Sequence, residues 1–343
     1  MFHRALAKRI ATTLIMTVAG MTVFLLSAGS SHVLGAAPIQ TRLSIVTGET
    51  HPYYPGAVKF KEALETESRG QILVQVFANA QIGDEAAGFQ LLRSGTLQFA
   101  QQSSSLASSA SNELKLQAWS LPFLYPDADA AYHAWDSELA VKSYAALEKS
   151  GVKCLARWDA GFRQLSANRP VSSMSDVRGL KIRTPDGAIY VSTWKALGAV
   201  PTPMAFTELY TALQTGVVDG TELPVQVFAS SKFDEVQKNY AIINYMNDPI
   251  CFSVSLKFFN GLSPELQQAV MKAAQASATA NRQAARASFD KAIEQVKASG
   301  VKITRPDTEP FRKAVAPVYE DFYKKVGEDA RGIVNAIIQL TKK

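Results

Sequence analysis

From residue 43 onward, the sequence alternates short apolar runs typical of β-strands with stretches of helical periodicity. Residues 43–47, 72–77 and 97–101 are expected to be strands, and residues 55–68 and 84–93 are expected to be the helices between them. This order of elements predicts an α/β architecture that begins with a compact β-α-β-α-β unit.

A second α/β unit is expected from about residue 152 onward. Its predicted strands are residues 152–156, 164–166, 180–183 and 217–219, and its predicted helices are residues 188–197 and 208–215. Between the two units, the Ser-rich residues 103–111 are expected to form an ordered loop and short helix at the edge of a cleft. A helix is expected over residues 128–149.

The last third of the chain is expected to be helical. Ser263, Pro264 and Glu265 provide an N-cap, a proline at the first helical position and an acid in the first turn. No strong helix breaker follows before Gly300, so this helix would be about 54 Å long at 1.5 Å per residue. Because that length exceeds one small lobe, the helix is expected to brace two. A final amphipathic helix is expected over residues 310–340.

The first 36 residues have the pattern of a secretory signal peptide. Arg4, Lys8 and Arg9 precede an apolar run over residues 10–28, and small residues at 35–37 provide a cleavage site. The alternative is an uncleaved N-terminal anchor, because the apolar run nearly reaches the length of a bilayer. With cleavage, the mature chain is expected to be a soluble protein of the periplasm. No cysteine lies near the cleavage site, which argues against a lipid-anchored protein.

The charge of the chain does not indicate a nucleic-acid partner. The formal net charge is +6, and three positive charges without an acid lie in the first 36 residues, which leaves +3 for the mature chain. No block of Lys and Arg marks a surface for nucleic acid or membrane.

Two cysteines, Cys154 and Cys251, are the complete set. An exported protein can hold a disulfide, but cysteines flanked by apolar residues are more often small core residues. Sequence alone leaves both interpretations open.

The usual signatures of catalysis are missing from the sequence. The mature chain has two histidines, His51 and His133, and neither an HExxH nor a CxxC motif that would indicate zinc. It also has no GxSxG, GxGxxG or GxxxxGK motif. The adjacent acids at residues 84–85 and 234–235 are typical of solvated helix starts. We therefore expect a binding protein with no catalytic residues, no cofactor and no metal.

Several segments together resemble one known family. They are Gly179 to Pro185 (GLKIRTP), Pro203 to Gly220 (PMAFTELYTALQTGVVDG), Gln81 to Glu85, Leu92 to Leu97, and Leu121 to Leu124. In their order and spacing they resemble the DctP-type solute-binding proteins of tripartite ATP-independent periplasmic (TRAP) transporters. The resemblance extends over most of the mature chain.

The resemblance implies a bilobal fold like that of periplasmic binding proteins. Two α/β lobes would be joined by crossing hinge strands, with a long helix along both. Lobe I would comprise residues 37–160 and 249–288, and lobe II would comprise residues 161–248 and 289–343.

The resemblance also implies a binding site for a carboxylate. Arg183 occupies the position of the family's carboxylate-binding arginine, and its planar guanidinium can donate two parallel hydrogen bonds. Alternatively, Arg183 pairs with a structural acid such as Asp186, which is itself a candidate ligand residue. Arg163 matches a second arginine near the ligand, and Phe206 matches an aromatic residue that packs on it. Trp158 is a candidate for the apolar wall, with an ordinary core position as its alternative.

One segment departs from the family pattern. Many relatives carry an asparagine where this chain has Leu223, which follows Glu222. Both residues are candidates for the site, and the leucine exchanges a polar contact for an apolar one. We therefore expect a carboxylate with a more apolar body, such as a keto, hydroxy or aromatic acid, rather than a sialic acid or some dicarboxylates.

The first lobe is expected to contact the far end of the ligand. Candidates at strand ends or in the loops after them are Thr47, His51, Gln102 and Ser103. His51 has the alternative role of capping the helix that follows it.

The leading hypothesis is a TRAP solute-binding protein that passes a small organic acid to the integral membrane subunits of its transporter. One alternative is a binding protein of another transporter class or a periplasmic sensor. A second is an enzyme on a related bilobal fold. The oligomeric state is left open.

Overall fold

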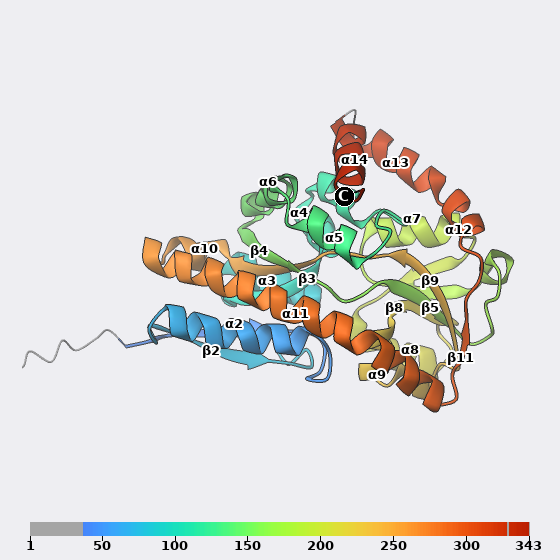
Figure 1. Cartoon of the computed structure of the whole chain (residues 1–343), viewed down its shortest axis with the longest axis horizontal. Helices are drawn as coiled ribbons and strands as arrows, with labels where there is room; N and C mark the ends of the chain where they lie inside the picture. Colours follow the sequence, from blue (N-terminus) through green and yellow to red (C-terminus); the bar gives the residue numbers. More distant parts are fainter. Residues whose placement is uncertain (1–36, 328, 343) are drawn as a thin grey trace, which may run out of the picture. The chain divides into compact units, whose positions relative to one another are not determined.

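A computed structural model of the chain describes residues 37–327 and 329–342 (Figure 1). The expected signal peptide, residues 1–36, lies outside the described residues. Within the described part, no helix combines the length and the apolar character needed to cross a membrane.

Five strands form the first sheet, in the spatial order β2-β1-β3-β10-β4. β1 runs parallel to β2 and β3, whereas β10 is antiparallel to both β3 and β4. Helices α2 (Tyr53–Glu67) and α3 (Glu85–Ser94) connect the first three strands, which produces the predicted β-α-β-α-β opening. The strands are β1 Ile39–Ser44, β2 Ile72–Phe77, β3 Phe99–Ser103, β4 Val152–Trp158 and β10 Ile250–Ser255.

Six strands form the second sheet, in the order β11-β9-β5-β8-β6-β7. β5 is antiparallel to β8 and β9, and β6 is parallel to β7 and β8. The strands are β5 Arg163–Ala167, β6 Lys181–Thr184, β7 Val200–Pro203, β8 Gly220–Pro224, β9 Asn239–Met246 and β11 Lys302–Thr304. The helices of this unit include α7 Ala188–Ala196, α8 Leu209–Gln214 and α9 Val225–Ser230.

The chain passes between the two sheets three times. It leaves the first sheet through residues 159–162, returns through residues 247–249, and leaves again along α11 (Pro264–Ala298) (Figure 1). The two sheets, their crossing connections and the long helix confirm the predicted bilobal α/β class.

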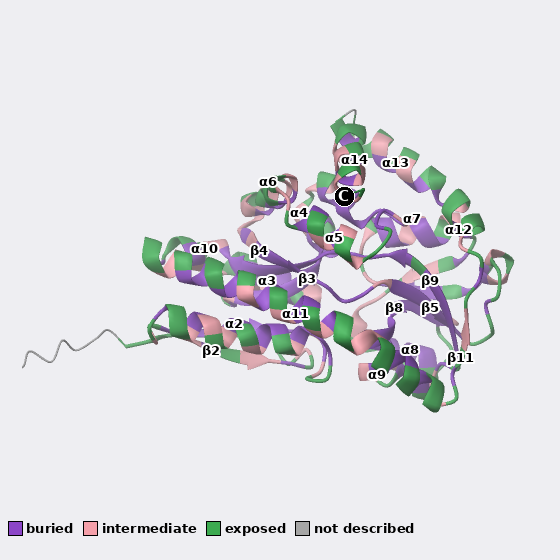
Figure 2. Cartoon of the chain, viewed as in Figure 1, coloured by how far each residue is buried: buried purple, intermediate pink, exposed green. Residues whose placement is uncertain are grey.

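Helix α11 has the predicted ends and joins two separate cores. The Ser263 hydroxyl accepts a hydrogen bond from the Leu266 amide, and the helix continues for 35 residues. Val270 belongs to the core cluster that includes α2, and Val296 belongs to the cluster that includes α9. Its two halves therefore pack against different parts of the fold (Figure 2).

The core reaches the middle strands of both sheets. Every residue of β3, β5, β8 and β10 is buried (Figure 2).

Two predicted long helices are broken in the structure. Residues 128–149 form α5 (Ala128–Trp135), α6 (Glu138–Tyr144) and a short 3₁₀ helix, because Ser137 starts a new helix by accepting a hydrogen bond from the Ala140 amide. Residues 310–340 form α12 (Glu309–Ala314), α13 (Ala316–Val326) and α14 (Asp329–Leu340). Pro317 lies in the first turn of α13 and Gly327 ends it with a φ of 98°, which fits their residue types.

Other elements shift or were not anticipated. The strand expected over residues 217–219 begins only at Gly220, and the one expected over 43–47 spans Ile39–Ser44. The Ser-rich segment forms the short helix α4 (Ser104–Ser111), as expected, and α10 (Leu256–Asn260) precedes α11. β9 and β10 were not predicted, although both are apolar and well defined.

Candidate functional site

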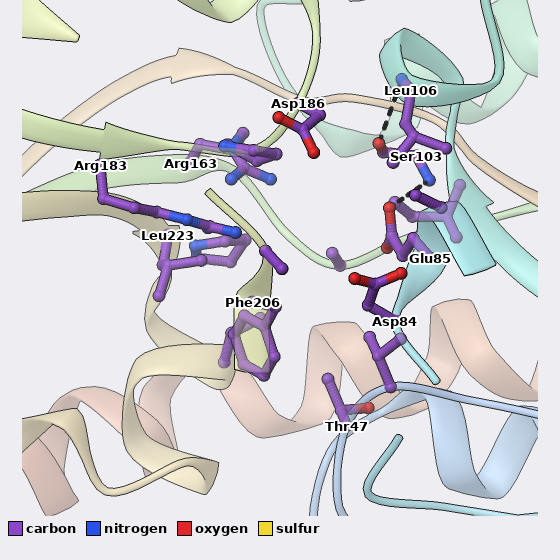
Figure 3. Close-up of a pocket in the computed structure, with 18 of the residues that line it drawn as sticks. Thr47, Asp84, Glu85, Ser103, Leu106, Arg163, Arg183, Asp186, Phe206 and Leu223 are labelled. Carbon is purple, nitrogen blue, oxygen red and sulfur yellow. Dashed lines mark hydrogen bonds between the residues drawn. The ribbon is translucent and has the colours of Figure 1, made fainter. Parts of the chain in front are cut away.

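A cavity lies between elements of the two sheets and their connecting segments (Figure 3). Its empty volume is about 670 Å³, part of which is open to solvent. Arginine, carboxylate, hydroxyl and apolar side chains surround it. The lining residues are Val46, Thr47, Tyr53, Asp84, Glu85, Ala86, Ser103, Leu106, Ala160, Arg163, Arg183, Pro185, Asp186, Met204, Ala205, Phe206, Leu223, Pro224, Val227 and Ile250.

Arg183 lies on β6 with its guanidinium directed toward the cavity (Figure 3). Its Nε and Nη2 donate hydrogen bonds of 3.0 and 2.7 Å to the Met204 carbonyl oxygen, which fixes the plane of the guanidinium. Nη1 has no hydrogen-bond partner among the described residues. Burial lowers the pKa of Arg183 to about 10, so the group stays charged at neutral pH. It can therefore bind an anion in the cavity.

The alternative ion pair between Arg183 and Asp186 does not form in the described part of the chain, although both residues line the cavity. Asp186 is exposed, whereas only 2% of Arg183 is exposed. Arg183 instead donates to a neutral carbonyl group. Among the described residues, no carboxylate forms an ion pair with it.

Arg163, on β5, is held by a buried carboxylate of the same sheet. Its Nε and Nη2 donate to the two Glu222 carboxylate oxygens, and Nη2 also donates to the Glu222 carbonyl oxygen at 2.8 Å. The Tyr245 hydroxyl donates to the same carboxylate. Burial lowers the pKa of Arg163, but the charge and hydrogen bond of Glu222 together with Tyr190 and Tyr245 outweigh this effect, and the pKa lies above its usual value. Arg163 therefore lines the cavity as a permanently charged and firmly oriented group.

Carboxylates line the cavity across from the arginines (Figure 3). Asp84 is the N-cap of α3, where one carboxylate oxygen accepts from the Ala87 amide at 2.8 Å. Its other oxygen has no hydrogen-bond partner among the described residues. Glu85 accepts from the Ser103 amide at 3.1 Å, and burial raises the pKa of Glu85. The cavity thus has positive groups on one wall and acceptor groups on another.

Apolar side chains fill the wall next to Arg183. Phe206 and Leu223 line the cavity together with Arg183 (Figure 3). Met204 and Val227 add to this wall. An apolar surface beside a buried arginine lowers the local polarity, and this strengthens a charge-assisted hydrogen bond to a bound carboxylate.

The structure brings most of the expected residues to the cavity. Arg183, Arg163, Phe206, Asp186, Leu223, Ser103 and Thr47 all line it. Their contact with a ligand stays a prediction.

Four expected ligand residues do not line the cavity. Trp158 stacks on Phe252 at 4.5 Å and donates to the Ser277 hydroxyl, which is its alternative core role. Glu222 is 0% exposed and holds Arg163. Gln102 is buried within β3.

His51 is the fourth of these residues. It is fully buried, and its Nδ1 accepts a hydrogen bond of 3.2 Å from the Tyr53 amide at the start of α2. Burial lowers the pKa of His51 to about 3, so the ring is neutral. These contacts correspond to the helix-capping alternative.

Sequence reasoning missed the acidic wall of the cavity, which Asp84 and Glu85 form. Asp84 and Glu85 were interpreted as solvated acids at a helix start, and Asp84 does cap α3. They also lie within the family-like segment Gln81 to Glu85, to which no binding role was assigned. That position was the one signal that could have identified them.

Asp248 provides a second buried carboxylate, which is linked through Tyr190 to Arg163 of the cavity. Asp248, in the connection between β9 and β10, accepts hydrogen bonds from the hydroxyls of Ser120 and Tyr190. The Arg163 guanidinium lies over the Tyr190 ring, 4.9 Å from its centre. Burial raises the pKa of Asp248 to about 6, although the two hydroxyl groups oppose the rise.

Asp248 should make the protein less stable as the pH rises from 4 to 7. Because the folded chain binds this proton more tightly than an unfolded aspartic acid, whose pKa is 3.8, the contribution of Asp248 to stability is largest below about pH 4 and is lost as the pH rises through 6. A shift of this size corresponds to about 3 kcal/mol. Urea unfolding should show that the stability of the wild type relative to Asp248→Asn falls by about this amount between pH 4 and 7. An equal difference in stability between the wild type and Asp248→Asn at both pH values would contradict this prediction.

Within the described residues, no group of three or more His, Cys, Asp or Glu side chains is arranged to hold a metal ion. The positive wall of the cavity can hold a carboxylate, and its acceptor wall can hold hydrogen-bond donors.

Comparison with known proteins adds independent information. The family model DctP, described as bacterial extracellular solute-binding protein, family 7, matches residues 43–326. The 2,3-diketo-L-gulonate-binding periplasmic protein of Escherichia coli is 30% identical over 327 residues, which cover 95% of this chain and 97% of the relative.

Solved structures are similar in fold as well as sequence. A sugar acid binding protein from Advenella mimigardefordensis, in complex with galactonate, has a TM-score of 0.84 and 29% identity, covering 89% of this chain and 98% of that one. A TRAP periplasmic solute-binding protein from Bordetella bronchiseptica, with density interpreted as pantoate, has a TM-score of 0.83 and 31% identity, covering 88% and 98%.

Proposed function

This chain belongs to the DctP family of bacterial extracellular solute-binding proteins, and from that membership we propose that it holds a small hydroxylated monocarboxylate in the cavity next to Arg183. Family membership makes the chain a periplasmic solute-binding protein of a TRAP transporter. The proposal concerns the class of ligand and the residues that bind it.

The observation that carries the proposal is the state of Arg183. The group is buried, charged at neutral pH and held by the Met204 carbonyl, with Nη1 free of protein partners among the described residues. A buried charge without a paired carboxylate is costly. A ligand carboxylate supplies the missing charge and a charge-assisted hydrogen bond.

The acidic wall limits what the rest of the ligand can be. A second carboxylate placed near Asp84 and Glu85 would be repelled by them, whereas a hydroxyl group could donate a hydrogen bond to either. The ligands of the relatives described above, diketogulonate, galactonate and pantoate, are all acids that carry hydroxyl groups. These features favour hydroxy acids over short dicarboxylates.

The apolar wall supports the expected apolar contact. Phe206 and Leu223 would pack on the carbon skeleton of the ligand beside its carboxylate. We expect pantoate-like and small sugar acids to fit better than larger polar acids such as sialic acid. The sequence predicted a keto, hydroxy or aromatic acid with a more apolar body, and the proposal narrows this class to hydroxy acids because their hydroxyl groups can donate to Asp84 or Glu85.

Closure would bring the two lobes together around the ligand. We propose the lobe limits 37–160 with 249–288, and 161–248 with 289–343. All strands of the first sheet fall within the first set, and all strands of the second sheet fall within the second. A ligand that contacts both sets stabilises the closed form by binding it more tightly than the open form. The closed form would then deliver the ligand to membrane subunits of the transporter.

The ligand is proposed to be released unchanged. Relatives across the family are named as binding proteins. The acids near the cavity are explained by helix capping and ligand contacts. Incubation of the protein with each bound acid, followed by NMR of the ligand, should show no product.

Asp84→Asn provides a sharp test of the acidic wall. Asparagine can still cap α3 but has no negative charge. Affinity for a hydroxy acid should fall about 5- to 10-fold because a charge-assisted hydrogen bond becomes a neutral one. Affinity for a short dicarboxylate should rise, because the repulsion is relieved. Calorimetric titration of both ligands measures the two changes.

A matched control exists for this variant. Asp127 caps α5 in the same way, accepting from the Ala130 amide at 2.8 Å, and does not line the cavity. Asp127→Asn should leave both affinities unchanged. A fall in affinity for both ligands with Asp84→Asn would argue against a wall that discriminates by charge.

The class of ligand is tested by a thermal-shift screen of the purified protein against organic acids, sugars and amines. A ligand at 100 times its dissociation constant adds about 2.7 kcal/mol of stability. We expect hydroxylated monocarboxylates such as galactonate and pantoate to raise the melting temperature. A response confined to dicarboxylates, amines or neutral sugars would refute the proposal.

A further inference from the structure

The two cysteines lie on neighbouring strands next to a second cavity. Cys154 is partly exposed on β4, and Cys251 is fully buried on β10. The second cavity has an empty volume of about 810 Å³, and its lining includes Cys154, Arg157 and Lys153. It shares no lining residue with the cavity that contains Arg183.

The strand register places both thiols on one face of the first sheet. Cys154 pairs with Ser253, and Cys251 pairs with Arg157, in an antiparallel ladder with an irregularity between Phe252 and Ser253. Residues two apart on a strand point to the same face, so Cys251 and Ser253 share a face with Cys154. The two cysteines are therefore diagonal neighbours across adjacent strands.

The surroundings make Cys154 the more reactive thiol. Burial raises the pKa of Cys154, but the Cys251 thiol and the positive charges of Arg157 and Lys153 outweigh it and hold the pKa below its usual value. Burial raises the pKa of Cys251, whose sulfur lies 3.5 Å from the Ser104 hydroxyl oxygen. A reachable thiol with thiolate character beside a buried thiol is the arrangement of an attacking and a resolving pair.

We propose that Cys154 and Cys251 form a disulfide by exchange with a small-molecule disulfide that enters the second cavity. The Cys154 thiolate attacks one sulfur of the reagent, the reagent's S–S bond breaks, and one thiolate leaves with the electron pair. Cys251 then gives its proton to the released thiolate and attacks the Cys154 sulfur, which releases the second thiolate. The two cysteines are oxidised by two electrons, and the reagent is reduced to two thiols.

The bond would connect the two strands that lead into the crossings between the sheets. β4 ends at Trp158, immediately before the crossing at residues 159–162, and β10 begins at Ile250, immediately after the crossing at 247–249. Because the protein works in the periplasm, an oxidising compartment, the linked form is expected to be the form present in the cell.

The test uses the full chain exported to the bacterial periplasm and purified without reductant. It is equilibrated with oxidised and reduced glutathione, alkylated under denaturing conditions and mapped by mass spectrometry. The proposal predicts a peptide pair joined through Cys154 and Cys251 that separates on reduction, and a higher melting temperature for the oxidised form. Alkylation of both cysteines after incubation with excess oxidised glutathione would overturn it.

Single variants test the order of the steps. Cys251→Ser should accumulate glutathione on Cys154, because no second thiol can release it, whereas Cys154→Ser should leave Cys251 unmodified in the folded protein. Stable glutathione on Cys154 of the wild type would contradict the proposal, since Cys251 would then fail as the resolving thiol. The mass-spectrometric map of the wild type shows whether the disulfide forms, even if Cys251→Ser folds poorly.

Discussion

Replacing Arg183 with alanine is expected to weaken binding of the ligand acid at least about 100-fold, which corresponds to about 3 kcal/mol. The variant removes a charge-assisted contact from a buried site, where such losses cost about 2–5 kcal/mol. The Met204 carbonyl loses its donor as well, but a carbonyl group at the cavity can be hydrated. Titration calorimetry with the best hydroxy acid measures the change.

Two further variants separate geometry from charge. Arg183→Lys keeps a positive charge but lacks the planar guanidinium, so it should bind with intermediate affinity. Arg305, an exposed arginine that follows β11, offers a matched control, and Arg305→Ala should bind like the wild type. Undiminished binding by Arg183→Ala would remove Arg183 from the site.

Glu222→Gln is expected to reduce the free energy of unfolding by about 3–5 kcal/mol, since it leaves a buried arginine without its charge partner. Glu222 is 0% exposed, and it holds Arg163 between β5 and β8 while accepting from Tyr245. Urea unfolding followed by circular dichroism measures the loss.

A surface ion pair supplies the comparison for this variant. Glu320 pairs with Arg331, and both side chains are more than half exposed. Glu320→Gln should therefore cost only about 0–1 kcal/mol. The double variant Arg163→Met with Glu222→Leu should recover much of the lost stability, because no buried charge is left unpaired. A similar loss for Glu222→Gln and Glu320→Gln would show that the buried pair has no special role.

The predictable parts of the fold were those with local signals. Helix α11 begins and ends as expected because Ser263, Pro264 and Gly300 act on their own immediate neighbours. Helices α12, α13 and α14 were predicted as one helix, because the amphipathic pattern does not reveal that Pro317 and Gly327 mark the breaks between three packed segments. β9 and β10 flank Asn247, Asp248 and Pro249, and these turn residues could have marked the boundary between the two strands.

The site was only partly predictable, because its chemistry depends on pairs distant in sequence. Arg183 and Phe206 could be identified from local family-like segments. The partner of Arg163 lies 59 residues away, so its ion pair with Glu222 could not be deduced from spacing. Asp84 shows a further difficulty, since one carboxylate both caps a helix and lines the cavity.

A crystal structure of the protein with a bound hydroxy acid would show whether Arg183 holds the ligand carboxylate. The account predicts that the ligand carboxylate accepts a hydrogen bond from Nη1 of Arg183, with a hydroxyl group donating to Asp84 or Glu85 and the carbon skeleton against Phe206 and Leu223. A ligand bound in this cavity with its carboxylate away from Arg183, or bound at another place, would contradict it.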